Sequence, residues 1–329
     1  MKLTTSLALG TAITAVLVGV AGCGSTGASP TGGSPGAKSL RLTLVQGIQG
    51  DEFYISMACG AAARAREAGA TLEVEAPAKF DATLQTPIVD AVIAKRPDAV
   101  LIAPNDRKTM VEPLRRIRAA GIKVVEVDTG VVDGDVSASS VTSDNLQGGR
   151  AAARSLLKLT GGKGSFLVIN VKPGISTTDQ RQKGFEAEIA KAKGVRYLGT
   201  QFSDDDAAKA GEITSETLAA HPGLTGIFAT NSFAAEGAAI ALRGASAQSR
   251  VKIVGFDAGP NQVRDLREDI VQSLVVQKPY DMGVMGVEQA LAAIEGRPTQ
   301  DRISTGFVVA TKENLDDPAI SRYLYKSRC

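Results

Sequence analysis

The stretch Leu40–Ala76 reads LRLTLVQGIQGDEFYISMACGAAARAREAGATLEVEA. It contains two short apolar runs, 40–46 and 71–76, on either side of a segment with a helical pattern, 52–69. Gly69 stands where the helix should end, because glycine adopts the left-handed backbone of a C-terminal cap without strain. A strand, a helix and a strand in this order predict a right-handed crossover between parallel strands. The sequence therefore predicts an α/β fold built on parallel sheet.

The same alternation continues along the chain and restarts near its middle. Further strands are predicted at 99–103, 122–127, 165–170, 195–202, 226–229, 251–256, 271–277 and 303–309. Further helices are predicted at 82–95, 107–120, 144–159, 178–192, 205–220, 233–243 and 280–295. Two halves of similar length predict two doubly wound parallel-sheet lobes joined by three hinge crossings.

The late elements set the predicted lobe boundaries, because they must cross between the halves. The predicted parts are an N-terminal lobe of 40–141 plus 279–304, a C-terminal lobe of 142–278 plus 305–312, and a tail of 313–329. We expect the crossings to act as hinges near Val141–Thr142, Gln277–Lys278 and Ser304–Thr305.

Composition excludes several functions. The 329 residues include 37 Lys+Arg and 35 Asp+Glu, so there is no basic excess of the kind that binds nucleic acid. A single histidine, His221, excludes His-rich metal sites and argues against Ser-His-Asp hydrolysis. The sequence contains no GxxxxGK[ST] phosphate loop, no GxGxxG after the first strand and no HExxH. We therefore expect no cofactor, no metal and no enzymatic activity.

The N-terminus predicts export. Within residues 1–23, the positively charged start Met1–Lys2 is followed by an uncharged, mostly apolar run from Leu3 to Val20, which is typical of a signal peptide. The tetrapeptide Val20–Cys23 resembles a bacterial lipobox, in which the cysteine is lipidated; the alternative is an ordinary signal peptide with a chance cysteine. Residues 24–39 contain only small and polar residues, proline and one lysine, so they predict a flexible tether. We expect a lipid anchor on the outer face of the cytoplasmic membrane.

Polar side chains follow most of the predicted strands. They are Asp51, Asp128, Asn231, Asp257 and Gln277, and the aromatic pair Phe53 and Tyr54 lies beside the first of them. Ligands of open parallel sheets bind beyond the carboxyl ends of the strands. Each Asp or Asn could instead cap the following helix. Carboxylates, amides and aromatic faces together suit a neutral polyhydroxylated ligand, a sugar or polyol.

From Leu40 to about Val309 the chain resembles the ribose-binding-protein group of bacterial ABC-importer solute-binding proteins. The matching motifs are Phe53-Tyr54, Val127-Asp128, Ser143-Asp144-Asn145, Arg181-x-x-Gly184-Phe185, Phe228-Ala229-Thr230-Asn231, Val254-Gly255-Phe256-Asp257 and Gln277. The resemblance implies that the ligand cleft is lined by Phe53, Tyr54, Asp128, Arg181, Asn231, Asp257 and Gln277. It also implies a monomer that delivers its ligand to a membrane permease whose ATPase subunit is separate.

Departures from the group bear on which ligand is bound. Ribose-type members carry an arginine where this chain has Thr129, and an aromatic residue near Asp206. The ligand could therefore be a sugar other than ribose or a linear polyol. Additional contacts are predicted from Asp51, Asp106, Thr129, Lys172, Asp206 and Phe80. The alternative function is a receptor that presents a sugar or autoinducer to a membrane sensor.

The cysteine count predicts one disulfide. Of three cysteines, lipid would occupy Cys23, which leaves Cys59 and Cys329 in an exported chain, where disulfides persist. The bond would attach the C-terminal tail to the first helix. The alternative is a buried, inert Cys59 and a free terminal thiol.

Overall fold

The computed structural model describes residues 39–329. The predicted signal peptide, the lipidation site Cys23 and the tether up to residue 38 lie outside the described residues. From residue 39 onward no helix is long and apolar enough to cross a membrane.

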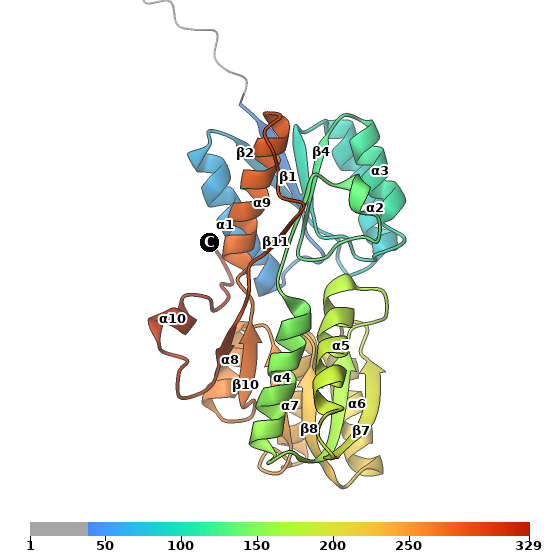
Figure 1. Cartoon of the computed structure of the whole chain (residues 1–329), viewed down its shortest axis with the longest axis vertical. Helices are drawn as coiled ribbons and strands as arrows, with labels where there is room; N and C mark the ends of the chain where they lie inside the picture. Colours follow the sequence, from blue (N-terminus) through green and yellow to red (C-terminus); the bar gives the residue numbers. More distant parts are fainter. Residues whose placement is uncertain (1–38) are drawn as a thin grey trace, which may run out of the picture. The chain divides into compact units, whose positions relative to one another are not determined.

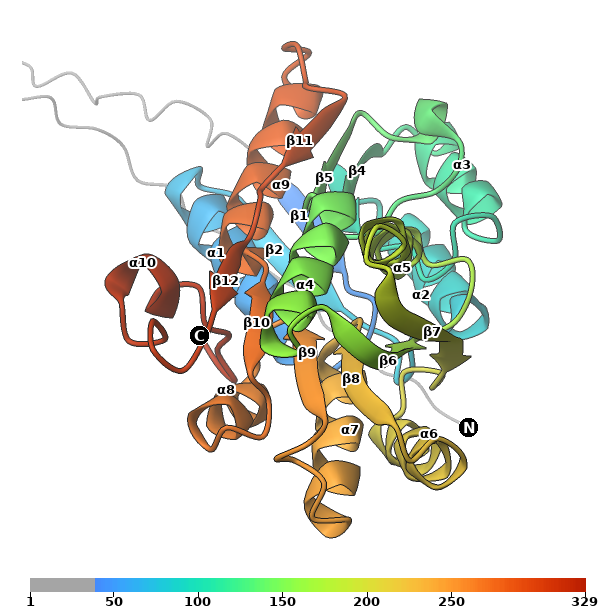
Figure 2. The ribbon, with the colours of Figure 1, turned by 60° about the horizontal axis from the view of Figure 1, so that its bottom comes forward.

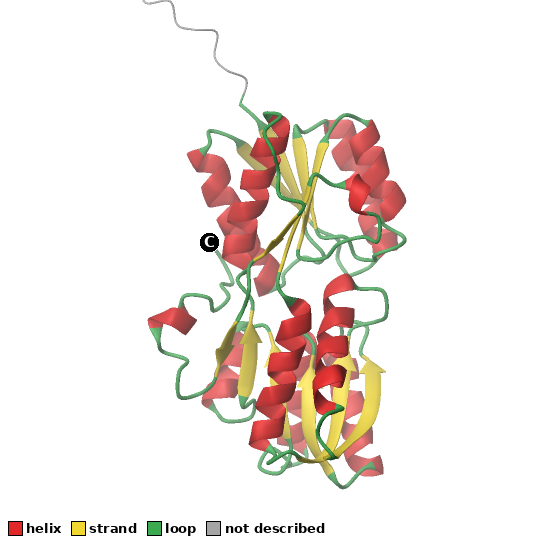
Figure 3. Ribbon diagram, viewed as in Figure 1, coloured by secondary structure: helices red, strands yellow, loops and turns green. Residues whose placement is uncertain are grey.

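The described chain contains two six-stranded sheets (Figure 3). The first is entirely parallel and has the order β11(Arg302–Ser304), β5(Ser139–Thr142), β4(Lys123–Val127), β3(Ala99–Ile102), β1(Arg41–Val45), β2(Thr71–Glu75). The second has the order β12(Val308–Ala310), β10(Ser273–Val276), β9(Lys252–Phe256), β8(Leu224–Ala229), β6(Lys163–Asn170), β7(Gly194–Phe202). Its strands are parallel except β12, which pairs antiparallel with β10. The predicted α/β class with two parallel-sheet lobes is confirmed.

Helices cover both faces of each sheet (Figures 1 and 2). Around the first sheet they are α1(Glu52–Glu67), α2(Ala82–Lys95), α3(Val111–Ala119) and α9(Pro279–Ile294), with the short 3-10 helix η1(Gly134–Val136). Around the second they are α4(Asn145–Leu159), α5(Ser176–Ile189), α6(Ala207–Ala220), α7(Ser232–Gly244) and α8(Pro260–Arg267), and α10(Pro318–Ser321) lies in the tail. We call the first sheet with its helices the N-lobe and the second with its helices the C-lobe.

The two sheets repeat one topology, with β4 and β9 at equivalent positions third from one edge. Buried strands such as β3 (AVLI) are apolar on both faces, as expected where helices cover both sides of a parallel sheet. In the C-lobe, Phe185 of α5 packs in one fully buried cluster with the strand residues Phe166, Phe228 and Phe256. Equivalent strands therefore end at equivalent places in the two sheets. The polar residues that follow these strands lie at equivalent places too.

Glycines allow two helices of the N-lobe to pack closely. α1 and α9 lie against each other, and an added methyl group at Gly283 would lie 2.1 Å from the Met57 carbonyl oxygen. At Gly60 it would lie 2.0 Å from the Tyr280 carbonyl oxygen. Both obstacles are backbone atoms, which cannot rotate away, so this pair of helices tolerates only glycine at the contact.

Two sequence predictions about element boundaries were wrong. The single strand expected at 303–309 is two strands, β11 and β12, in different sheets, because Gly306 adopts φ +66° between them. The helix expected from residue 107 begins at Val111, since Asp106 Oδ1 accepts from the backbone N–H groups of Lys108 and Thr109 and holds that segment in turns. The strand β5 and the helices α8 and α10 were not predicted, because each is short.

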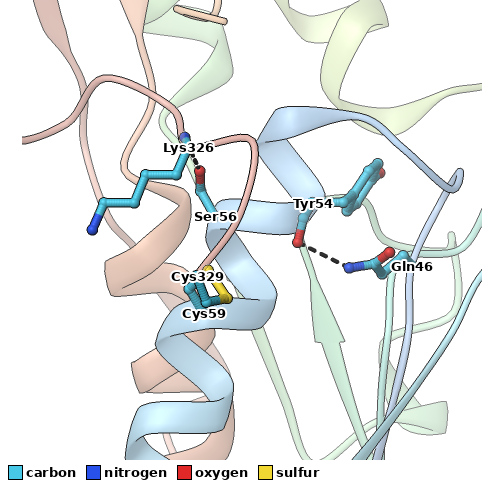
Figure 4. Close-up of a disulfide and its surroundings, with 6 residues drawn as sticks. All are labelled: Gln46, Tyr54, Ser56, Cys59, Lys326 and Cys329. Carbon is cyan, nitrogen blue, oxygen red and sulfur yellow. Dashed lines mark hydrogen bonds between the residues drawn. A yellow bond between two sulfur atoms is a disulfide. The ribbon is translucent and has the colours of Figure 1, made fainter.

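The tail is joined to α1 by the predicted disulfide (Figure 4). The sulfur atoms of Cys59 and Cys329 are bonded, with their Cα atoms 5.4 Å apart across a separation of 270 residues. The Lys326 backbone N–H donates to Ser56 Oγ at 2.8 Å in the same region. The predicted pairing is therefore present, and it fixes the end of the chain to the N-lobe.

The glycine contact generates a stability prediction. Gly283→Ala should destabilise the protein by about 1–3 kcal/mol, because an overpacked helix contact must open. Gly244→Ala is the matched control: Gly244 ends α7 on the surface and nothing lies within 4 Å of an added methyl group. Chemical denaturation of both variants is the measurement. A Gly283→Ala variant as stable as the control would contradict the packing described.

Candidate functional site

A cavity lies between the carboxyl ends of the two sheets. It is lined by Asp51, Phe53, Tyr54, Phe80, Asp128, Thr129, Val171, Ile175, Thr177, Thr178, Arg181, Asp205, Asn231, Asp257 and Gln277. Both lobes contribute, so the cavity is complete only when the two are brought together.

The cavity brings together all seven residues that the family resemblance implies: Phe53, Tyr54, Asp128, Arg181, Asn231, Asp257 and Gln277. Asp51, Thr129 and Phe80 line it as well. Two of these also cap helices, as the alternative interpretation held: Asp51 Oδ1 accepts from the Phe53 N–H, and Asn231 Oδ1 accepts from the Ala234 N–H. Capping and cavity lining therefore coexist in the same side chains.

Three weaker candidates do not line the cavity. Asp106 is occupied by its turn, and Lys172 Nζ donates to the Phe80 carbonyl at 2.9 Å. Asp206 caps α6 by accepting from the Lys209 N–H. The acidic residue of this loop that lines the cavity is its neighbour Asp205, which was missed. The preference of aspartate for helix N-caps could have found it, because the last acidic residue before α6, Asp206, takes the cap. Its neighbour Asp205 is then left for the cavity.

Asp128 and Asp257 occupy equivalent places after β4 and β9. Both have a positive φ, +64° and +80°, and the backbone N–H of each donates to the neighbouring strand, to Val141 and Val275 respectively. Each side chain also accepts from a tyrosine hydroxyl, Asp128 Oδ2 from Tyr54 at 2.8 Å. The two lobes thus present one fixed carboxylate each.

Asp257 is held by donors from three separate segments. Gln277 Nε2 donates to its Oδ1 at 2.6 Å, Tyr325 O–H donates to the same oxygen at 2.9 Å, and the Ser232 N–H donates to Oδ2 at 3.2 Å. Such a carboxylate has little rotational freedom, so its remaining acceptor directions point at fixed positions in the cavity.

Arg181 is the cation of the cavity wall. Its Nε donates to Asn145 Oδ1 at 2.9 Å and its Nη1 to the Thr230 carbonyl at 2.8 Å. The guanidinium lies over the Phe256 ring, 3.8 Å from the centroid. These contacts fix the plane of the group and leave Nη2 for a ligand oxygen, which a guanidinium binds strongly when both are buried.

Two cavity hydroxyls have no hydrogen-bond partner within the described part of the chain. They are Thr129 Oγ1 and Thr178 Oγ1, on residues that are 2% and 4% exposed. A buried hydroxyl without a partner is costly, about 1–3 kcal/mol. Both line the cavity, so a ligand with hydroxyl groups would satisfy them.

Carboxylates dominate the electrostatics. Burial raises the pKa of Asp128 to about 6, against the lowering effects of Arg181 and the Tyr54 hydrogen bond. Burial raises the pKa of Asp205 to about 6 as well, and burial together with Asp257 and Asp205 raises the pKa of Asp51 well above its usual range. Among residues 39–329 no group of three acidic, His or Cys side chains is arranged to hold a metal ion. The site is one of hydrogen-bond acceptors.

Hydrogen bonds across the cavity mouth hold the lobes together. Besides the bond from Lys172 to Phe80, the Gly130 N–H donates to Ser176 Oγ at 2.9 Å. The Arg107 N–H donates to the Gly174 carbonyl at 3.0 Å. In each pair one residue belongs to the N-lobe and the other to the loop before α5 or its first turn. The lobes are therefore closed over the cavity.

The three chain crossings are hydrogen-bonded to one another. The Thr305 N–H donates to the Thr142 carbonyl at 2.9 Å, and Ser143 Oγ donates to Gln277 Oε1 at 2.9 Å. Thr142 Oγ1 donates to the Asp128 carbonyl at 2.6 Å. The crossings are therefore coupled directly to Asp128 and, through Gln277, to Asp257.

Fold and cavity together define a two-lobed binding protein, and comparison with known proteins gives the family. Residues 43–298 match the family model described as the periplasmic binding protein domain, so the chain belongs to that family. It is a binding protein and not an enzyme.

Its relatives include the ribose import binding protein of Bacillus subtilis, 27% identical over 84% of this chain and 88% of that protein. An ABC transporter solute-binding protein from Agrobacterium vitis, bound with α-D-tagatopyranose, is 41% identical with a TM-score of 0.86 and covers 88% of this chain and 100% of that chain. A carbohydrate transporter solute-binding protein from Agrobacterium radiobacter, in complex with D-arabinose, is 26% identical with a TM-score of 0.84, covering 87% and 99%.

The raised pKa of Asp128 generates a stability prediction for the unliganded protein. Between its unfolded value of 3.8 and about 6, the folded state binds the proton more tightly, so the free energy of unfolding falls as the pH rises through this window. The loss is on the order of 3 kcal/mol in total. Asp128→Asn should remove it, because asparagine keeps the positive φ and the Tyr54 contact without the charge.

Melting temperatures between pH 4 and pH 7.5 measure this effect. Asp128→Asn should be more stable than the parent at pH 7.5, with the difference vanishing towards pH 4. Asp204→Asn is the control, since Asp204 also has a positive φ but its side chain is 60% exposed and paired with Lys209. Equal pH profiles for the parent and Asp128→Asn would show that Asp128 is not the group described.

Proposed function

We propose that this chain is the extracytoplasmic solute-binding lipoprotein of an ABC importer. It captures a sugar or polyol between its lobes, closes, and delivers it to a membrane permease whose ATPase subunit is separate. The observation that carries the proposal is a cavity between the lobes in which fixed carboxylates, a fixed guanidinium and unpartnered hydroxyls surround aromatic rings. That combination matches the hydroxyl groups and the C–H faces of a sugar and offers nothing to an apolar ligand.

The residues would divide the work by chemistry. Asp51, Asp128, Asp205 and Asp257 accept from ligand hydroxyls, while Arg181, Asn231 and Gln277 donate to ligand oxygens. Phe53, Tyr54 and Phe80 cover the C–H faces of the ring. The relatives from Agrobacterium are bound to α-D-tagatopyranose and to D-arabinose, which supports a monosaccharide of five or six carbons.

The location follows from the N-terminal sequence. Lipidation at Cys23 would hold the chain on the outer face of the cytoplasmic membrane, and the tether of residues 24–39 would leave the lobes free to close and reach a permease. We propose that the chain works as a monomer. The alternative, a receptor for a membrane sensor, has no feature of the cavity in its favour, and the relatives named above are import and transporter proteins.

Removing a cavity carboxylate should weaken sugar binding strongly. Asp257→Ala should weaken the affinity for the sugar at least about tenfold to a hundredfold, because a ligand hydroxyl buried without its charged partner is left unsatisfied. The ligand is first chosen by thermal shift from D-tagatose, D-ribose, D-allose, D-arabinose and their alditols, and its affinity is measured by calorimetry. Arg181→Ala should be similarly damaging.

Asp204→Ala is the control, because it also removes one carboxylate and changes the net charge equally, but Asp204 is exposed and lies outside the cavity. If Asp257→Ala, still folded by circular dichroism, binds as tightly as Asp204→Ala, the cavity is not the ligand site.

Ligand release requires the lobes to open about the three crossings, near Val141–Thr142, Gln277–Lys278 and Ser304–Thr305. Hinge closure around ligand is the motion of periplasmic binding proteins. Small-angle scattering should therefore give a smaller radius of gyration with saturating sugar than without it. Sugar that binds by calorimetry but leaves the scattering profile unchanged would rule out closure.

A further inference from the structure

The last residues of the chain form a strap between the lobes. After β12 in the C-lobe, the Tyr325 N–H donates to the Ala258 carbonyl at 3.1 Å, directly beside Asp257. One residue later the Lys326 N–H donates to Ser56 Oγ on α1 in the N-lobe. The disulfide to Cys59 then ends the segment covalently (Figure 4). We call residues 324–329 the strap.

The strap contributes one buried side chain, and that side chain contacts the ligand cavity from behind. Tyr325 is 7% exposed and its hydroxyl donates to Asp257 Oδ1 at 2.9 Å. Its ring meets the Phe53 ring edge to face, with centroids 5.8 Å apart. Asp257 and Phe53 both line the cavity, whereas Tyr325 itself does not. Tyr325 is therefore placed to act on the ligand only through these two residues.

The N-lobe contains the counterpart of this contact. Asp128 occupies in the first sheet the position of Asp257 in the second, and it accepts from the Tyr54 hydroxyl at 2.8 Å. Tyr54 lies inside a helix of sixteen residues, whose packing holds it. Tyr325 has no such support, since it lies outside regular secondary structure, four residues before Cys329.

We infer that the strap is part of the ligand site: Tyr325 is a positioning residue that fixes Asp257 and Phe53, and the Cys59–Cys329 disulfide keeps Tyr325 in place. The inference rests on the proposed function and adds a segment to the site that lies beyond the last strand. A segment without regular secondary structure is poorly ordered unless something fastens it, and here the fastening is covalent. Without Tyr325, Gln277 is the one donor to Asp257 Oδ1 that remains among the described residues.

The first test removes one hydroxyl. Tyr325→Phe keeps the ring against Phe53 and deletes the donor to Asp257, so it should weaken sugar affinity about tenfold. Tyr323→Phe is the matched control, because it deletes a hydroxyl two residues earlier that accepts from the neighbouring Arg322 and does not contact the cavity. The sugar is whichever of D-tagatose, D-ribose, D-allose and D-arabinose gives the parent its largest thermal shift. Its affinity is measured by calorimetry at a temperature well below every variant's melting temperature.

The second test separates positioning from general stability. The double variant Cys59→Ser/Cys329→Ser should also lose affinity, and adding Tyr325→Phe to it should cost little more, because both changes act through the same contact. A strap that only stabilises the fold would lower the melting temperatures and leave the affinities equal.

The outcomes distinguish this inference from the proposed function. A parent that binds sugar while Tyr325→Phe binds within twofold of it overturns the role of Tyr325. A parent that binds while the cysteine double variant matches it overturns the role of the disulfide. A parent that binds none of the sugars overturns the proposed function, and this inference falls with it.

Discussion

The hydrogen bonds of the Gln277 amide connect the chain crossings with the cavity. Its oxygen accepts from Ser143 on another crossing, and its nitrogen donates to the Asp257 carboxylate. The amide has one acceptor and one donor side, and here each is assigned to a different part of the molecule. A movement of the crossings relative to each other therefore changes the geometry of a cavity carboxylate directly. Among the described residues, this contact joins the lobes' motion to the ligand site.

The repeated topology explains why both lobes can grip one ligand. Strands β4 and β9 are equivalent, and each is followed by an aspartate whose backbone turns out of the sheet. Because the carboxyl ends of parallel strands lie along one edge, each sheet gathers its polar residues at that edge. Bringing two such edges face to face encloses a ligand between two similar sets of acceptors, with the aromatic residues Phe53, Tyr54 and Phe80 added by the N-lobe alone.

The cavity could be predicted from the sequence wherever a polar residue directly follows an apolar strand. Asp128, Asp257 and Gln277 meet that rule, because the end of a buried strand fixes where the next side chain lies, and Asn231 follows its strand one residue later. Asp205 does not directly follow a strand. The positive φ of both Asp204 and Asp205 decides which acidic side chain of this loop turns into the cavity. Tyr325 followed no local rule, because its contact depends on a disulfide 270 residues apart in sequence.

The fold shows the same division between local and distant causes. Alternating strands and helices were predictable because each apolar run is long enough to reveal its period. The break between β11 and β12 was not, because Ile303–Val309 looks like one strand until two different sheets compete for its ends. Gly306, with φ +66°, supplies the turn that lets the chain serve both.

The positive φ of Asp128, Asp257 and Asp205 restricts how the site can change in evolution. Aspartate and asparagine tolerate that backbone, while most longer or branched residues do so only under strain. Acceptors at these positions can therefore be exchanged for amides or lost, but not readily lengthened or replaced by bulky groups. Divergence towards new ligands is expected to accumulate instead at Thr129, Thr178 and Phe80, which line the same cavity from unstrained backbone.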